Sequence, residues 1–180
     1  GDLTGGVSFD GIVQNNTAVL LGGTIDMELI GGLSQQSDAC GNTVVVAGGT
    51  ASDNVSGGQA LEGGNASGNS VHLVGEGASY TLGGTAYQGG KVAIKGSVYA
   101  GFAGVGGSDN NSVHVYGTGI NIGGSIDYSQ QLNFHLVQGQ AAAPSTPMVT
   151  LGGALNLEGV ELGFNGDAVT DWAAFEGKSI

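Results

Sequence analysis

The sequence has few cysteine, proline or basic residues. Its 180 residues include one cysteine, two prolines and three lysines, and arginine is absent. The single cysteine, Cys40, excludes an internal disulfide. Three basic residues against a formal net charge of −12 exclude a basic nucleic-acid surface and disfavour an anionic membrane surface.

Long apolar runs are also missing. No stretch approaches 18 apolar residues, so no transmembrane helix is predicted. No secretory signal opens the chain, and no terminating element precedes Ile180. We therefore expect a piece of a longer protein whose other parts carry the targeting information. Only 10% of residues are charged, which predicts a surface of Gly, Ser, Thr, Asn and Gln, as in extracellular repeat proteins.

Glycine is abundant, with 38 residues, but it lacks the three-residue period of collagen. Three segments, at 42–48, 69–75 and 111–117, share one pattern: Asn, then Ser or Thr, then apolar residues two positions apart, then a small residue. This alternation predicts a strand with one buried face, and the leading Asn predicts a bend, with side-chain amides stacked between copies. The repeated positions are Asn42, Val44 and Val46, then Asn69, Val71 and Leu73, then Asn111, Val113 and Val115.

Each copy has an upstream partner, a short apolar strand followed by two small residues at Gly31-Gly32, Gly57-Gly58 and Ala100-Gly101. The units begin at Leu29, Val55 and Val98, 26 and then 43 residues apart, which predicts one turn of a coiling chain and then roughly two. Many short strands with glycine turns fit a sandwich or a solenoid. The recurrence favours an all-β parallel β-helix, a single-stranded solenoid with little or no α-helix and roughly eight rungs.

The histidines at 72 and 114 occupy the same slot in two repeats. Alternation directs both side chains outward, so we expect His72 and His114 to form a column on the surface. A metal site needs further ligands, and the third copy has Val45 in this slot, so neither a metal nor a cofactor is predicted. Near the end of the chain, Trp172 and Phe175 are expected to cap the last rung.

Enzymatic chemistry has little support in the pattern, and no catalytic residue is predicted. The closest carboxylate pairs are Asp26 with Glu28 and Glu158 with Glu161, which is the minimum for glycoside hydrolysis. No arginine accompanies them, and the other acids are spread singly through loops. A polysaccharide-cleaving β-helix enzyme stays the alternative. Calcium-binding Gly/Asp repeats require tandem copies, and the sequence has a single imperfect copy, at 106–109. A calcium-binding repeat is therefore not predicted.

The glycine-pair and Asn-Ser/Thr-Val units over residues 29–165 resemble the passenger regions of bacterial autotransporters, as does the run from Leu132 through a proline-bearing loop to Val160. The resemblance implies a right-handed β-helix, with residues 1–130 carrying the repeats and 131–180 forming more regular rungs before an outer-membrane barrel that is absent here. It also implies a non-enzymatic secreted or cell-surface fragment, an adhesin or stalk. Its expected partner is a glycan or protein on a host or bacterial surface, with membrane contact only through the barrel.

Overall fold

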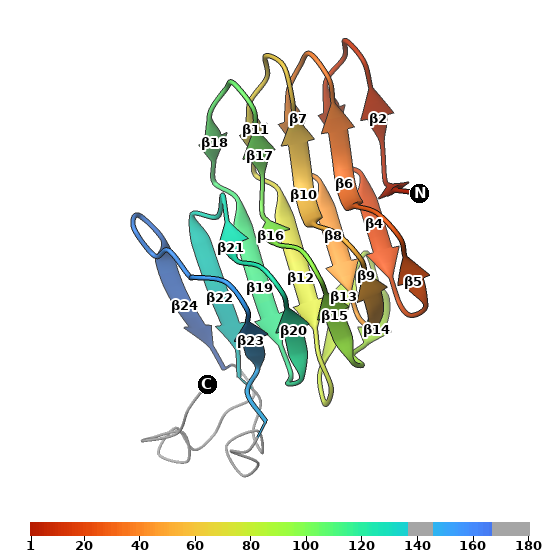
Figure 1. Ribbon diagram of the computed structural model, residues 1–180, viewed down its shortest axis with the longest axis vertical. Coiled ribbons are helices and arrows are strands. Elements are labelled where there is room, and N and C mark those ends of the chain that lie inside the picture. Colours follow the sequence, from red (N-terminus) through yellow and green to blue (C-terminus); the bar gives the residue numbers. More distant parts are fainter. Residues whose placement is uncertain (137–145, 167–180) are drawn as a thin grey trace.

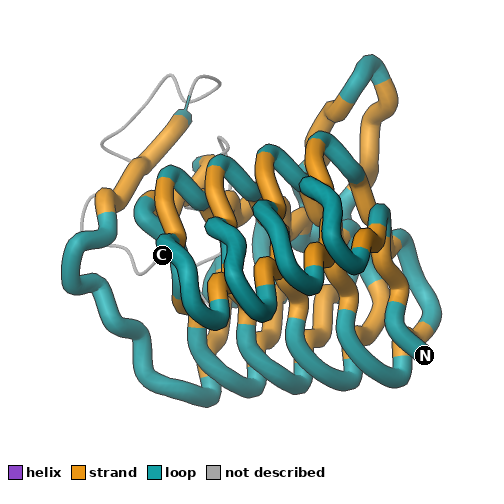
Figure 2. The backbone as a smooth tube through the Cα atoms, turned by 90° about the horizontal axis from the view of Figure 1, so that it is seen from above, coloured by secondary structure: helices purple, strands orange, loops and turns teal. Residues whose placement is uncertain are grey.

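The computed structural model describes residues 1–136 and 146–166, and these ranges form strands, turns and loops without a helix (Figure 1). Within them, accordingly, no helix is long and apolar enough to cross a membrane. The strands lie in four parallel sheets, A to D, and one antiparallel hairpin. Each of the first four turns visits the sheets in that order, and the turns lie side by side in Figure 2.

Sheets A and B form the first half of each turn. Sheet A contains β1 (Leu3–Thr4), β2 (Val7–Ser8), β6 (Leu29–Ser34), β10 (Val55–Ala60), β16 (Val98–Tyr99), β17 (Phe102–Ala103) and β21 (Ile126–Asp127). Sheet B contains β3 (Val13–Gln14), β7 (Ala39–Cys40), β11 (Ala66–Ser67) and β18 (Ser108–Asp109).

Sheets C and D form the second half of each turn, and the hairpin follows sheet C in the third. Sheet C contains β4 (Thr17–Leu20), β8 (Thr43–Val46), β12 (Ser70–Val74), β19 (Ser112–Tyr116), β22 (Gln131–His135) and β24 (Glu161–Asn165). Sheet D contains β5 (Thr24–Ile25), β9 (Gly49–Ala51), β15 (Val92–Ile94), β20 (Ile120–Ile122) and β23 (Val149–Leu151). The hairpin joins β13 (Ser79–Leu82) to β14 (Thr85–Gln88).

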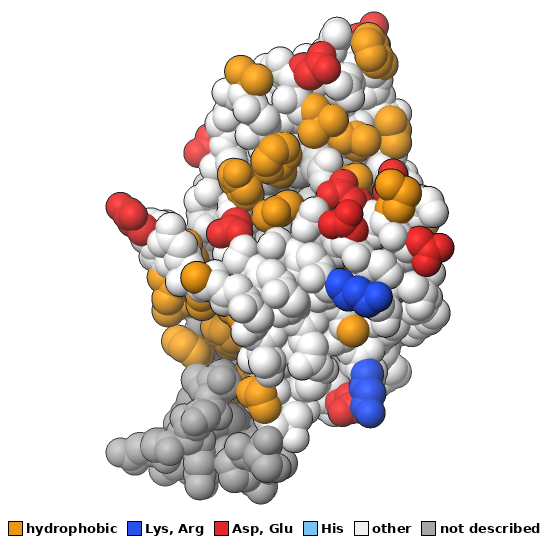
Figure 3. Space-filling view, viewed as in Figure 1, with side chains coloured by type: hydrophobic (Ala, Val, Ile, Leu, Met, Phe, Trp, Pro, Cys, Tyr) orange, Lys and Arg blue, Asp and Glu red, His pale blue; other side chains and the backbone are white. Residues whose placement is uncertain are grey.

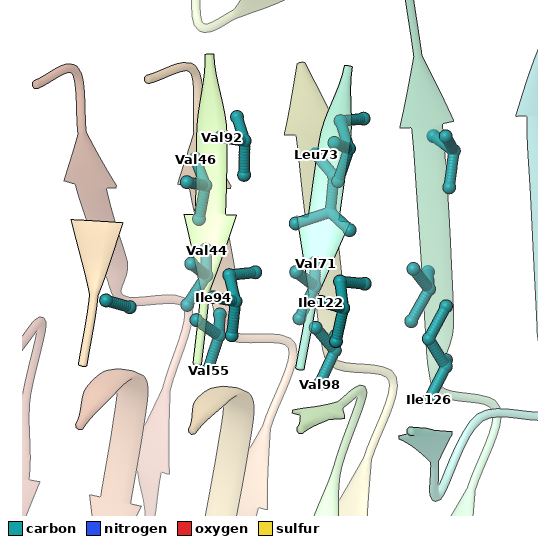
Figure 4. Close-up of a cluster of buried hydrophobic side chains, with 14 of the residues drawn as sticks. Val44, Val46, Val55, Val71, Leu73, Val92, Ile94, Val98, Ile122 and Ile126 are labelled. Carbon is teal, nitrogen blue, oxygen red and sulfur yellow. The ribbon is translucent and has the colours of Figure 1, made fainter. Parts of the chain in front are cut away.

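Equivalent segments lie beside one another in parallel register, so the predicted parallel β-helix is confirmed. In sheet C, Val71 pairs with Val44 on one side and with Val113 on the other. The side chains of the predicted inward positions are fully buried. They meet residues from sheets A and D in one continuous core, part of which Figure 4 shows. Burying an aliphatic side chain of this size stabilises the fold by about 1.5–3 kcal/mol.

The prediction of roughly two turns between the second and third units is wrong. The interval of 43 residues from Val55 to Val98 is one turn, because these residues pair directly across adjacent strands of sheet A. The excess length is the β13–β14 hairpin, which projects out of the coil between sheets C and D. In the described residues sheet C holds six strands, against the eight expected. At about 4.8 Å between strands, six strands span about 24 Å.

A ladder of side-chain amides runs through the bend between sheets B and C. The backbone N–H of Asn42 donates to Oδ1 of Asn69 at 2.9 Å, and Nδ2 of Asn42 donates to the same oxygen at 3.1 Å. Nδ2 also donates to the carbonyl of Val13 in the preceding turn at 3.0 Å. This set repeats from Asn69 to Asn111. The asparagine ladder comprises Asn16, Asn42, Asn69 and Asn111, with Gln130 in the fifth place.

The ladder explains both the leading Asn and the second small residue of the upstream pair. Asn42, Asn69 and Asn111 are completely buried, and each residue bonds to the turns before and after it through its side-chain amide and backbone N–H, as buried polar groups require. A Cβ at Gly58 would come within 2.4 Å of Oδ1 of Asn69, so only glycine leaves room for the amide. The same contact recurs at Gly6, Gly32 and Gly101.

After residue 130 the solenoid continues in part. Strands β22 and β24 extend sheet C and β23 extends sheet D. The described residues therefore add rungs to the same solenoid beyond the predicted boundary. The fifth turn is shorter than the others just before this boundary. Only three residues, 128–130, separate β21 in sheet A from β22 in sheet C, and no sheet B strand lies between them.

Candidate functional site

The outer side of sheet C carries a column of stacked rings. His72 and His114 pair in register, as the repeat predicts, and their rings stack 4.6 Å apart at 6°. The rings of Tyr116 and His135 stack 4.0 Å apart at 15°. The ring of Tyr80 from the hairpin stacks 4.0 Å from that of His72. We call this group, His72, Tyr80, His114, Tyr116 and His135, the His–Tyr column.

The expectation that this column lies on the surface is wrong for His72, whose side chain is only 7% exposed. The hairpin covers it and packs over a second apolar cluster outside the solenoid core. Val45, Ala47 and Val74 form the buried base of this cluster. Tyr80, Leu82 and Tyr87 of the hairpin pack against that base. The consecutive valines at 44–46 could have indicated this cover, because one of them must point outward.

Hydrogen bonds join the rings across the turns. The hydroxyl of Tyr116 lies 3.2 Å from Nδ1 of His72, and that of Tyr80 lies 3.3 Å from Nε2 of the same ring. Nδ1 of His114 lies 3.0 Å from Nε2 of His135, and one of these nitrogens must carry the shared proton. Nε2 of His114 lies 3.1 Å from the hydroxyl of Ser112. The network therefore fixes the orientation of the imidazoles.

Burial keeps the imidazoles of His72 and His114 uncharged at neutral pH. The pKa of His72 is lowered from 6.5 to about 3, mainly because burial removes water from the ring. The nearby His114 and His135 lower it further. Burial is also the main cause that lowers the pKa of His114 to about 4, and the nearby His135 adds to it. Burial is the main cause that raises the pKa of Tyr116, and the nearby Tyr80 adds to it. At neutral pH, His72 and His114 are therefore neutral rings that stack without charge repulsion.

The described residues contain no group of three or more His, Cys, Asp or Glu side chains arranged to hold a metal ion. The histidine nitrogens face hydroxyls and one another instead. The sulfur of Cys40 lies 3.3 Å from the hydroxyl of Ser67 in the next turn. Trp172 and Phe175, the predicted end cap, lie outside the described residues.

The predicted carboxylate pairs have different surroundings. Glu28 is half-buried beside sheet A, and its two carboxylate oxygens accept hydrogen bonds from Asn54 at 3.0 Å and from Gln59 at 3.3 Å. Its predicted partner Asp26 is exposed. Glu158 and Glu161 are both exposed, in the loop before β24 and at its start. Of these four acids, only Glu28 is held in place by neighbouring side chains through hydrogen bonds.

A second group of rings, which the sequence analysis did not single out, lies on the outer side of sheet A. Tyr128 is 43% exposed and packs edge-to-face on Tyr99 and Phe102, with centroids 5.5 and 5.2 Å away. Tyr99 and Phe102 are half-buried, and they pair in register with Ser56 and Gln59 of the turn before. Figure 3 shows hydrophobic side chains and carboxylates together on this face. We call Tyr99, Phe102 and Tyr128 the aromatic face.

This aromatic face has no counterpart in the other turns, because Tyr99 and Phe102 stand where the turn before has Ser56 and Gln59, and Tyr128 lies outside the strands. Tyr128 follows the last strand of sheet A, where the chain turns directly toward sheet C, and its φ is +52°. A bulky residue rarely adopts this left-handed backbone. Strained positions of this kind gather at functional sites, so the aromatic face is the second candidate region.

By structure, the described part of the chain is a parallel β-helix with an internal asparagine ladder. No known protein family, no curated protein and no solved structure matches it.

Proposed function

We propose that this chain is a non-enzymatic passenger segment of a bacterial autotransporter, exposed on the cell surface or secreted, and that it acts as an adhesin or as a stalk that presents one. Its role is then mechanical reach combined with a long lateral face for repeated contacts. The ligand is a glycan or a protein on a host or bacterial surface.

The asparagine ladder is the observation that carries this proposal. Each of the three buried asparagines bonds to the turns on both sides, so neighbouring turns cannot slide or rotate without leaving buried donors unpaired. Such coupling favours a stiff solenoid whose lateral faces keep a constant spacing. The low fraction of charged residues and the many small polar residues suit an extracellular setting.

The rival function is a β-helix enzyme that cuts polysaccharides. A hydrolase needs two carboxylates facing each other across the scissile bond. In the described residues Glu28 is held by amides, whereas Asp26 beside it in sequence is exposed. This separation of environments favours the binding function over the catalytic one.

The two functions predict different results in one assay. The purified chain is incubated with polyuronates and with neutral polysaccharides, and both depolymerisation and retention on the insoluble polymers are measured. We expect retention on a surface ligand, or none for a pure stalk, without shortening of any polymer. Release of oligosaccharides that scales with protein concentration would overturn the proposal.

A further inference from the structure

We propose that the aromatic face, together with the carboxylates of Glu28 and Asp127, binds an uncharged polysaccharide chain lying along the solenoid axis. This inference rests on the adhesin form of the proposed function and names the ligand class and the site.

The rings present an apolar surface that is fixed in place. The centroids of Tyr99 and Phe102 lie 6.1 Å apart, and the ring of Tyr128 stands at 81° and 87° to the other two. Each ring therefore supports the others and loses little freedom when a ligand arrives. The apolar C–H faces of pyranose rings pack on such aromatic side chains, and a tyrosine hydroxyl at the rim bonds to the sugar hydroxyls.

Two carboxylates on the same side of the solenoid can accept hydrogen bonds from hydroxyl groups: Asp127 next to Tyr99, and Glu28 beyond Gln59 of the turn before. Glu28 is held by Asn54 and Gln59, and both protons of the Gln59 amide are used, on Glu28 and on Ser56. Asp127, which directly precedes Tyr128 and pairs with Tyr99, accepts a hydrogen bond from the hydroxyl of Ser125. Few, fixed polar groups around an apolar surface are typical of small-molecule and sugar sites.

Charge selects among the polysaccharides. The chain carries a formal net charge of −12 with three lysines, and the fixed side chains at this site are carboxylates and amides. A polyuronate or a sulfated glycan would be repelled by this field. An uncharged chain is not repelled, and its hydroxyls donate to the carboxylates through charge-assisted hydrogen bonds.

The spacing of the solenoid suits a polymer. Tyr99 pairs in register with Asp127 of the turn after, so the ring and the carboxylate lie side by side along the solenoid axis. Ser56 and Gln59 of the turn before, by contrast, are buried. Paired positions on adjacent turns are about 4.8 Å apart, which is close to the length of one pyranose unit. Two successive sugars along one chain can therefore meet Tyr99 and Asp127 on successive turns.

The test is retention of the chain on insoluble neutral polysaccharides, namely cellulose, xylan, mannan and β-1,3-glucan, with polygalacturonate and heparin as anionic probes. Tyr128→Asn removes the exposed ring while keeping a residue that tolerates positive φ. Tyr99→Ser removes a second ring. Phe164→Asn is the matched control, because Phe164 is 49% exposed in β24 of sheet C, away from this face.

We expect binding to at least one neutral polymer, with affinity reduced about tenfold, or ~1.4 kcal/mol, by Tyr128→Asn and by Tyr99→Ser, and unchanged by Phe164→Asn. Affinity should change little between about 50 mM and about 500 mM salt, because no ion pair with the ligand is involved. Circular dichroism and thermal unfolding of each variant identify any loss of affinity that comes from misfolding.

Three results would overturn the inference: binding to none of the neutral polymers, preference for an anionic polymer, or equal affinity in the folded ring variants and the wild type. If the chain attaches to cells or to a protein through another face, the proposed sugar site is refuted and the adhesin function still holds. If a bound neutral polymer is cleaved, the sugar site still holds and the non-enzymatic assignment is refuted.

Discussion

The asparagine ladder and the His–Tyr column are two stacks of polar side chains in the same repeats, one inside the solenoid and one outside it. Each buried asparagine finds its partners in the turns before and after, so the register alone satisfies it. His72 depends on Tyr80, which belongs to a hairpin inserted in a single turn. The asparagine ladder therefore follows from the repeat alone. The burial of the His–Tyr column needs the hairpin, which only one turn contains.

The comparison also separates two kinds of polar burial. An amide cannot change its charge, so the ladder should be insensitive to pH. The imidazoles can take up protons, and burial has moved the pKa of His72 and of His114 well below 6.5. The predictions below remove members of each stack, beginning with the largest expected effect.

Replacing Asn69 by Ala should have the largest effect. It leaves the backbone N–H of Asn42 and the carbonyl of Ala39 buried without these partners, and it opens a cavity beside Gly58. We expect a loss of about 3–5 kcal/mol in the free energy of unfolding, measured with denaturant. Asn16→Ala, at the half-buried end of the ladder, is the control and should lose about 1 kcal/mol. Equal losses would show that the ladder is not what couples the turns.

Lowering the pH should destabilise the protein through the His–Tyr column. The unfolded chain binds a proton at His72 near pH 6.5, whereas the folded chain binds it only near pH 3, with His114, His135, Tyr80 and Tyr116 around the ring. The free energy of unfolding is therefore unaffected by His72 above pH 6.5. It falls by up to about 1.4 kcal/mol per pH unit below this value and levels off below about pH 3.

The contribution of His72 to this slope can be isolated with His72→Phe, which keeps an aromatic ring between Tyr80 and His114. The variant should show a shallower fall in unfolding free energy between pH 6.5 and pH 4, with the remaining slope arising from other groups, including His114. An identical slope in variant and wild type would contradict the assignment.

Replacing Gly58 by Ala tests the contact between the small residue of the pair and the ladder. The new Cβ would lie within 2.4 Å of Oδ1 of Asn69, and overpacking of this kind destabilises a protein by about 1–3 kcal/mol. Gly22→Ala is the matched control, because a Cβ there meets nothing within 4 Å and the backbone is not left-handed. Similar thermal stability in the two variants would mean that Gly58 is not required for close approach.

Replacing Tyr80 by Ala should have the smallest effect on stability, about 1–2 kcal/mol, because the half-buried ring contributes one face of the outer cluster. It should also return the pKa of His72 toward 6.5 by admitting water. Titration of the His72 ring protons by NMR measures this directly. A pKa that stays near 3 would show that the hairpin is not the cause of the shift.

The repeated part of the fold could be predicted from the sequence, and the exceptions to the repeat could not. The Asn-Ser/Thr-Val pattern carries the strand, its inward face and its stacked amides, because one geometry recurs at Asn42, Asn69 and Asn111. The length of a turn was not predictable, since an inserted hairpin and a second turn both add residues between repeats. The cover over His72 and the exposure of Tyr128 both arise where the pattern is interrupted.

The stacking of adjacent turns can be tested by cysteine cross-linking in a Cys40→Ser background. Ser70 and Ser112 pair in register in adjacent strands of sheet C, whereas Gln131 pairs with Ser112 one turn further along. Cysteines at 70 and 112 should form a disulfide readily under mild oxidation, because adjacent strands place them about 4.8 Å apart. Cysteines at 70 and 131 should not. Efficient cross-linking of the second pair, or failure of the first, would contradict the in-register solenoid on which the account depends.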